Sequence, residues 1–94
     1  MAYRLAFKKS AKEEWDNLDG SVRKQFKKKL LERLEEPKIE SAKLNGMKDC
    51  HKIKLRRAGY RLVYQVRDAE VIVSVIAVGK RERNAVYKAA TKRI

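Results

Sequence analysis

The stretch HKIKLRRAGYRLVYQV, residues 51–66, decides the fold because its alternation predicts a β-hairpin with two unlike faces. Side chains on a strand point alternately to opposite faces of the sheet. One face of this hairpin would collect the apolar set, which is His51, Ile53, Leu55, Leu62, Tyr64 and Val66. The other face would collect the basic set, which is Lys52, Lys54, Arg56 and Arg61, together with Val63, Gln65 and Arg67.

The register of the hairpin follows from the same alternation. Partners that share a face must have numbers with an odd sum, as Arg56 and Arg61 do. That condition fits a loop of two residues, Ala58–Gly59, or a loop made of residues 57–60. Like charges on neighbouring rungs repel each other, so the crowded cations indicate a polyanionic ligand.

Net charge favours the same kind of ligand. The 94 residues include 25 Lys and Arg against 12 Asp and Glu, which gives a formal net charge of +13. A small domain does not need that much charge for solubility. Nucleic acid is therefore the favoured partner, and an anionic membrane surface is the weaker alternative. The length fits one domain, residues 1–94.

Targeting signals are absent from this sequence. Its longest apolar run, residues 71–78, is far shorter than the roughly 18 residues of a membrane span. Residues 1–5 lack the apolar region of a signal peptide. The single cysteine, Cys50, allows no internal disulfide. We therefore expect a cytoplasmic protein without membrane association, in which Cys50 is a buried small side chain.

Helical patterns precede the hairpin. A strand at residues 3–7 leads into a helix from Ser10, where Ser10 and Glu13 match a capping box. A second helix follows the break at residues 19–21 and ends near Glu36, because Pro37 disfavours helical geometry in the residue before it. Its predicted apolar stripe is Val22, Phe26, Leu30, Leu31 and Leu34.

The remaining elements complete an α+β fold. Residues 37–49 form a polar connector with a turn at Asn45–Gly46, and residues 71–78, apolar on both faces, predict a central strand. Asn84 would cap a short C-terminal helix with Val86, Ala90 and Ile94 on one side. We expect two N-terminal helices packed as a hairpin on one face of a mainly antiparallel sheet. The other face would be left to the basic set.

Metal chemistry finds little support in these residues. One histidine, one cysteine and no close carboxylate cluster cannot supply three or four metal ligands. A phosphate-binding glycine loop is also absent. His51 falls on the apolar side of its strand, which favours a buried or sheet-edge histidine over a general base. We therefore expect no metal and no cofactor.

The basic set suits a reaction that cleaves RNA, in which a 2′-hydroxyl group of the RNA attacks the adjacent phosphate. That reaction needs a proton acceptor, a cation that stabilises the phosphorane, and a proton donor for the leaving 5′-oxygen. Forked guanidinium groups match phosphate geometry. Neighbouring cations lower the pKa of a lysine, so Lys52 and Lys54 are candidate proton acceptors. A face that only binds phosphate or water is the alternative.

Two tyrosines lie outside the predicted apolar stripes. Tyr60 sits at the hairpin loop and Tyr87 in the basic tail, so both are candidates to stack on bases or act on a hydroxyl. For Tyr60 a structural role at the loop is an equal alternative. For Tyr87, which follows Arg81 and Arg83 by about one helical turn, function is favoured.

Several motifs together resemble the RelE family of bacterial toxins. They are KLNG at residues 43–46, KIKLR at 52–56, GYRLVY at 59–64 and VGKRER at 78–83, followed by Tyr87. Their order and spacing match the family over essentially the whole chain. The hairpin motif is shared by the wider RelE/ParE superfamily. The added Lys52 and Lys54 pair, Arg81 and Tyr87 resemble the members that cleave mRNA.

The resemblance implies a type II toxin, a metal-independent endoribonuclease that enters the ribosomal A site, cuts mRNA and inhibits translation. Residues matching Lys52 and Lys54 are linked in that family to activating the 2′-hydroxyl and stabilising charge. Arg61 matches a residue that holds the phosphate, and Arg81 a stabiliser or proton donor to the leaving oxygen. Tyr87 matches a residue that stacks on or orients the substrate. Side chains expected to contact mRNA or rRNA are Lys48, Arg56, Arg57, Tyr60, Lys80 and Arg83.

A cognate acidic antitoxin, RelB-like, is the implied protein partner, and DNA would be reached only through the antitoxin complex. We expect it to wrap the chain, to cover or distort the basic face, or to displace the helix at residues 86–94. The sequence departs from the family at two positions. Asn45 stands where the best-known branch tends to have arginine, and His51 stands where an aromatic residue is usual.

Two other classes share parts of the pattern. A ParE-like toxin would have the same fold but would inhibit a topoisomerase without cutting RNA. A non-catalytic RNA-binding module would need only charge and aromatic side chains. Ribosomes programmed with a defined mRNA separate the three classes, because only the nuclease cuts the A-site codon.

Overall fold

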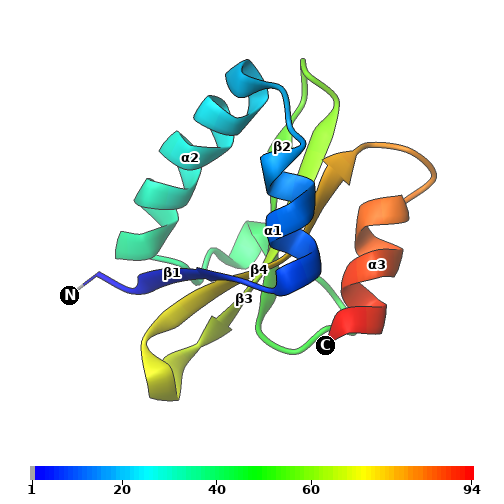
Figure 1. Cartoon of the computed structure of the whole chain (residues 1–94). Coiled ribbons are helices and arrows are strands. Elements are labelled where there is room, and N and C mark those ends of the chain that lie inside the picture. Colours follow the sequence, from blue (N-terminus) through cyan, green and yellow to red (C-terminus); the bar gives the residue numbers. More distant parts are fainter. Residues whose placement is uncertain (1) are drawn as a thin grey trace.

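The computed structural model describes residues 2–94 as a four-stranded sheet with helices on both of its faces (Figure 1). The strands are β1 (Arg4–Phe7), β2 (Cys50–Leu55), β3 (Tyr60–Arg67) and β4 (Ile72–Lys80), in the order β1-β4-β3-β2. β1 runs parallel to β4, and the other neighbours are antiparallel. The helices are α1 (Lys9–Asp16), α2 (Gly20–Glu35) and α3 (Ala85–Arg93), with 3-10 turns η1 (Glu40–Ala42) and η2 (Asp68–Glu70). The predicted α+β class is confirmed.

The β2–β3 hairpin keeps the predicted parity with a different register. Lys54 pairs with Arg61, and Leu55 pairs with Tyr60, so the numbers of partners do have an odd sum. The turn consists of residues 56–59, and Gly59 takes the left-handed conformation with φ +74°. The expected pairing of Arg56 with Arg61 is wrong, because Arg56 belongs to this turn and not to the strand.

A first apolar core lies between the sheet and helices α1 and α2, as predicted. Its buried members include Trp15, Phe26, Leu30, Ile53, Leu55, Leu62 and Tyr64. The predicted stripe of α2 is wrong at Leu31, which is 55% exposed. Buried positions on α2 follow the four-residue spacing of Val22, Phe26 and Leu30, and Leu31 lies about 100° around the helix from the last of them.

The predicted capping box is also wrong. Helix α1 starts at Lys9 with Lys8 as its N-cap residue, so Ser10 already lies inside the first turn. α2 begins after Asp19 and ends before Glu36, at the positions that the break and Pro37 predicted. None of the helices in residues 2–94 is long and apolar enough to cross a membrane.

The opposite face of the sheet carries a second apolar core, which the sequence did not predict. α3 buries Val86 and Ala90 there against Met47, Cys50, Val63, Ile76 and Ala77. The expectation that this face is left to the basic set is therefore wrong for the part that α3 covers. Ile94, expected on the packed side of α3, is 47% exposed. Burial raises the pKa of the Cys50 thiol to about 11, in line with the predicted buried side chain.

A β-bulge in β4 makes both cores possible. Val63 pairs with Ala77 while Tyr64 pairs with Val75, so Ile76 is an extra residue on β4. The extra residue shifts the alternation of the strand. Val75 and Val78 reach the first core, whereas Ile76 and Ala77 reach the second. The continuous apolar run that predicted a strand covered on both sides is thus correct for β4.

Tyr64 and His51 lie on the helix side of the hairpin, as their parity predicted. The Tyr64 hydroxyl donates to the Pro37 carbonyl at 2.7 Å and accepts a hydrogen bond from Arg33 at 2.8 Å. The His51 ring stacks on Tyr64 with centroids 5.5 Å apart. Burial lowers the pKa of His51. These contacts tie the end of α2 to the hairpin.

Adjacent leucines on α2 test the first core. We expect Leu30→Ala to lower the free energy of unfolding by about 2–5 kcal/mol, because it leaves a cavity in a fully buried site. Leu31→Ala, the matched control on the exposed side, should change it by less than about 0.5 kcal/mol. Urea unfolding followed by circular dichroism measures both values. Equal losses in the two variants would contradict the assigned face of α2.

Candidate active site

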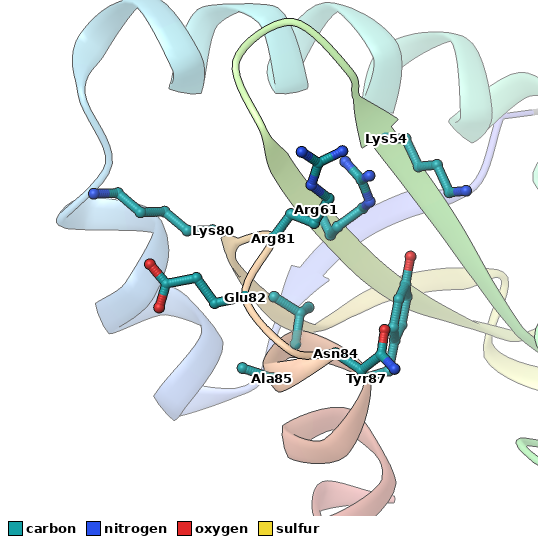
Figure 2. Close-up of a pocket in the computed structure, with 9 residues that line it drawn as sticks. Lys54, Arg61, Lys80, Arg81, Glu82, Asn84, Ala85 and Tyr87 are labelled. Atoms are coloured by element: carbon teal, nitrogen blue, oxygen red, sulfur yellow. The ribbon is translucent and has the colours of Figure 1, made fainter.

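A pocket of about 140 Å³ opens where the hairpin, the end of β4 and the start of α3 meet. Its lining includes Lys54 from β2, Arg61 from β3, Arg81 from the segment after β4, and Tyr87 from α3. Figure 2 shows the Tyr87 hydroxyl pointing toward the side of the pocket that holds the Arg61 and Arg81 side chains. Lys80 also lines the pocket, but its side chain extends the other way (Figure 2).

The chain after β4 turns sharply to bring α3 back over the sheet. The Arg81 amide donates to the Gly59 carbonyl at 2.7 Å, which ties this segment to the hairpin turn. Arg83 and Asn84 then take consecutive left-handed conformations with φ +45° and +60°. Such conformations cost about 1–2 kcal/mol for a residue other than glycine or asparagine, so tertiary contacts must hold this turn. The turn aims Tyr87 at the pocket.

Arg61 is the most deeply placed cation of the site. It is 7% exposed, and its guanidinium donates to the Tyr60 carbonyl at 3.0 Å. None of the four ion pairs in residues 2–94 includes Lys52, Lys54, Arg61 or Arg81. These four side chains therefore make no ion pair with a carboxylate of the described chain, and the one carboxylate in the pocket lining is that of Glu82. Such a pocket suits an anion with several oxygen atoms. The expectation that one face of the sheet is left open for the basic set is therefore wrong for Arg61, which is buried.

The two lysines of β2 differ in their surroundings. Lys54 lines the pocket, whereas Lys52 lies one rung further along the same face, opposite the buried Val63. The charge of Lys52 is the main cause that lowers the pKa of Lys54, followed by slight desolvation and by the charges of Arg61 and Arg56. A lower pKa increases the neutral fraction of the amine. Of the two candidate proton acceptors, Lys54 is the one that lines the pocket, and its pKa is lowered by its surroundings.

The expected RNA contacts do not all border the pocket, because Lys48 lies at the opposite end of the hairpin, where its carbonyl accepts a hydrogen bond from Gln65. Arg56 and Arg57 are exposed in the hairpin turn, Lys48 is exposed on the connector, and Arg83 is exposed beyond the pocket lining. Tyr60 packs against the first core on the helix side, which fits the structural alternative. Among residues 2–94, no group of three or more histidine, cysteine or acidic side chains is arranged to hold a metal ion.

Asn84 is the pocket residue that sequence reasoning assigned only to a helix cap. It makes no side-chain capping bond, and its amide lies beside Tyr87 at the mouth of the pocket (Figure 2). The signal available in the sequence was the tolerance of asparagine for positive φ. That property predicts a tight turn at Asn84 but does not reveal which side chains the turn brings together.

Comparison with known proteins defines the class to which this fold and site belong. Residues 5–85 match the family described as the ParE toxin of type II toxin–antitoxin system, parDE. The mRNA interferase toxin RelE of Escherichia coli (strain K12) is 62% identical over 94 residues, covering 100% of this chain and 99% of that protein. The mRNA interferase RelE of Shigella flexneri has the same identity and coverage.

Solved structures agree with these relatives. A mutant of the Escherichia coli toxin RelE in the free state superposes with a TM-score of 0.93 at 60% identity, covering 100% of this chain and 99% of that one. The toxin in the intact Escherichia coli RelBE toxin–antitoxin complex gives 0.84 at 61% identity, covering 87% of this chain and 100% of that one. The chain is a type II toxin by its family model. More narrowly, it belongs to the RelE family, as its motifs predicted.

Removing the charge of Lys52 tests the coupling between the two lysines. We expect Lys52→Met to raise the pKa of Lys54, because the largest cause of its lowering is lost. Lys48→Met removes a cation from the connector and should leave the pKa of Lys54 where it is. NMR titration of the Lys54 side-chain methylene next to the amine reports the pKa. An unchanged value in Lys52→Met would show that the two amines do not interact.

Proposed function

We propose that this protein is an mRNA interferase, an endoribonuclease that cuts mRNA in the ribosomal A site and so inhibits translation. The observation that carries the proposal is the pocket itself. Lys54, Arg61, Arg81 and Tyr87 come from separate elements and line one cavity of about 140 Å³. The names of relatives that are 62% identical describe mRNA interferases.

The proposed chemistry assigns a task to each side chain. Neutral Lys54 takes the proton of the 2′-hydroxyl, and Lys52 keeps the pKa of Lys54 low. Arg61 and Arg81 donate hydrogen bonds to the phosphorane oxygens as negative charge builds on them. Arg81 donates a proton to the departing 5′-oxygen and is reprotonated from solvent, Lys54 returns the proton it took to solvent, and Tyr87 orients the substrate. Because the nucleophile belongs to the substrate, the upstream product ends in a 2′,3′-cyclic phosphate.

Binding is assigned to the exposed cations outside the proposed catalytic set. Lys48, Arg56, Arg57, Lys80 and Arg83 lie on the surface at different distances from the pocket, where phosphates of mRNA or rRNA would neutralise them. Tyr60 is half buried against the first core, so only part of its side chain is available for the proposed RNA contact. The ribosome supplies the positioning of the substrate that the pocket alone does not provide, because it holds the mRNA in one conformation over the cations. The cytoplasm, where mRNA is translated, is the proposed site of action.

An acidic RelB-like antitoxin is the proposed protein partner. The Escherichia coli relative has been solved as a RelBE toxin–antitoxin complex and with an antitoxin RelBc peptide. The chain here carries the +13 charge that would attract an acidic segment. DNA would be reached only through the antitoxin. α3 is a suitable target for displacement, because Val86 and Ala90 are its only fully buried residues among those described.

Single-turnover cleavage on programmed ribosomes separates transition-state contacts from binding contacts. We expect Arg81→Ala and Lys54→Ala to lower the saturating cleavage rate by roughly a hundredfold or more, with ribosome affinity nearly intact. Arg61→Ala and Lys52→Ala belong to the same class. Tyr87→Phe keeps the ring and removes the oxygen, so it separates stacking from hydroxyl chemistry. Primer extension and the chemistry of the new 3′ end identify the cut.

The matched controls are Arg57→Ala and Lys48→Ala, because the charge of Arg56 also lowers the pKa of Lys54. Each should weaken binding modestly while the saturating cleavage rate stays the same. The slope of the logarithm of the binding constant against the logarithm of salt concentration should become shallower by about 0.7 per lost phosphate contact with single-stranded RNA. Unchanged saturating rates in both Arg81→Ala and Lys54→Ala would reduce the pocket to a binding platform. No cut in the A-site codon with the unaltered protein would exclude the proposed activity.

Electrostatic attraction should set the association rate of the antitoxin, and apolar contacts should set its dissociation rate. We expect the association rate with an acidic antitoxin to fall steeply as salt rises, because screening weakens attraction to the basic surface. The dissociation rate should change much less, because apolar contacts do not depend on ionic strength. Surface plasmon resonance over a salt series measures both. A partner that binds equally fast at low and high salt would contradict an electrostatic contribution.

A further inference from the structure

Strand β4 has an open edge beyond the end of β1. β1 pairs only with residues 72–75 of β4, and the chain then leaves the sheet to form α1. From Ile76 onward, the side of β4 that faces away from β3 has no neighbouring strand. Buried backbone groups without partners are costly. The backbone N–H and C=O groups along this edge must therefore find hydrogen-bond partners other than a strand.

A side-chain pair takes the place of the missing strand. Arg93, near the end of α3, donates to the Ile76 carbonyl at 2.9 Å. Glu14, on α1, accepts a hydrogen bond from the Val78 amide at 3.3 Å. The two side chains also join each other through two hydrogen bonds, at 2.8 and 3.1 Å. One carboxylate and one guanidinium therefore pair with both backbone groups and with each other.

The placement of this pair is specific to the fold. α1 packs on one face of the sheet and α3 on the other, so the pair reaches around the open edge between them (Figure 1). Ile76 is also the extra residue of the β-bulge, whose backbone groups leave the regular ladder. The Glu14 and Arg93 side chains are 35% and 23% exposed, so they are partly shielded from water. Glu14 raises the pKa of Arg93.

We propose that Glu14 and Arg93 form a latch that closes the open edge of β4, holds α3 against the sheet and thereby positions Tyr87 in the pocket. α3 has nine residues, which is too short for a stable isolated helix. Its docking depends on Val86 and Ala90 with the partly buried Tyr87 and Ala89, on the contact of the Thr91 hydroxyl with the Met47 sulfur, and on this latch. Tyr87 at one end of α3 and Arg93 at the other belong to the same short rigid body. The part of the inference that concerns Tyr87 rests on the proposed function.

A plain ion pair at the surface is the competing explanation, and it predicts little effect because such pairs contribute little to stability. The latch differs from it by its backbone hydrogen bonds. Exchanging the two residues, Glu14→Arg with Arg93→Glu, would restore opposite charges. It would also set a donor against the Val78 amide and an acceptor against the Ile76 carbonyl. The latch therefore predicts no rescue by the exchanged pair.

Amide hydrogen exchange followed by NMR tests the latch directly. Glu14→Gln and Arg93→Gln should each speed exchange at the Val78 amide and across α3 by about tenfold, as expected for loss of a charge-assisted hydrogen bond. The control is Asp16→Asn. It breaks the Lys12–Asp16 ion pair of 2.6 Å on the same helix α1 without touching β4, so exchange at Val78 and α3 should stay unchanged.

Single-turnover cleavage links the latch to Tyr87. Glu14→Gln should lower the saturating rate by about fivefold to tenfold with ribosome affinity retained, as a misplaced group does. In a Tyr87→Ala background the same change should have almost no further effect, because the latch acts through that ring. Equal losses in both backgrounds would overturn the positioning role.

The two proposals fail in different ways. Unchanged exchange at Val78 and α3 in both latch variants would overturn the latch, as would full rescue by the exchanged pair. If the unaltered protein cut no mRNA on ribosomes, the proposed function would fail. The exchange measurements would then still decide whether Glu14 and Arg93 hold α3.

Discussion

Burial of one face of the β2–β3 hairpin holds the mutually repelling cations of the other face together. Each fully buried Leu, Ile or aromatic side chain contributes about 1.5–3 kcal/mol, and Ile53, Leu55, Leu62 and Tyr64 are all buried. Repulsion between neighbouring like charges on a sheet costs about 0.2–1 kcal/mol per pair. The free energy gained by burying these side chains is therefore much larger than the cost of the repulsion. A slip by one residue would expose the apolar set and bury the lysines, so the register that protects the core also sets the position of Lys54 opposite Arg61.

Alternation is the reason why much of the fold and the centre of the site could be predicted from sequence. It placed Lys52, Lys54 and Arg61 on one face and His51 on the other, and the structure agrees. Features that depend on distant contacts escaped it. The position of the hairpin turn, the bulge at Ile76 and the second core under α3 are settled by how β3, β4 and α3 fit together. No local pattern in residues 56–59 or 72–80 encodes them.

The candidate site likewise combines residues that the sequence could place with residues whose positions depend on tertiary contacts. Arg81 and Tyr87 lie in a basic tail whose cations are locally equivalent, and the family resemblance, not the residue pattern, separated them from Lys80 and Arg83. The structure adds the physical reason. Two consecutive left-handed residues and the bond from the Arg81 amide to the Gly59 carbonyl return the chain to the hairpin. The difference between Lys52 and Lys54 is likewise a matter of which one faces the pocket, and parity cannot resolve it.

The shortness of β1 connects the edge of the sheet to the site. A longer β1 would have covered β4 at Ile76 and Val78, and α3 would then have had no backbone groups to bind at its far end. Because β1 stops at Phe7, α1 brings Glu14 to that edge, and the bulge leaves the Ile76 carbonyl available to Arg93. α3 is thus held by its share of the second core, by the contact of the Thr91 hydroxyl with the Met47 sulfur and by this polar pair. Because the helix has only nine residues and carries Tyr87, a change at its far end reaches the pocket.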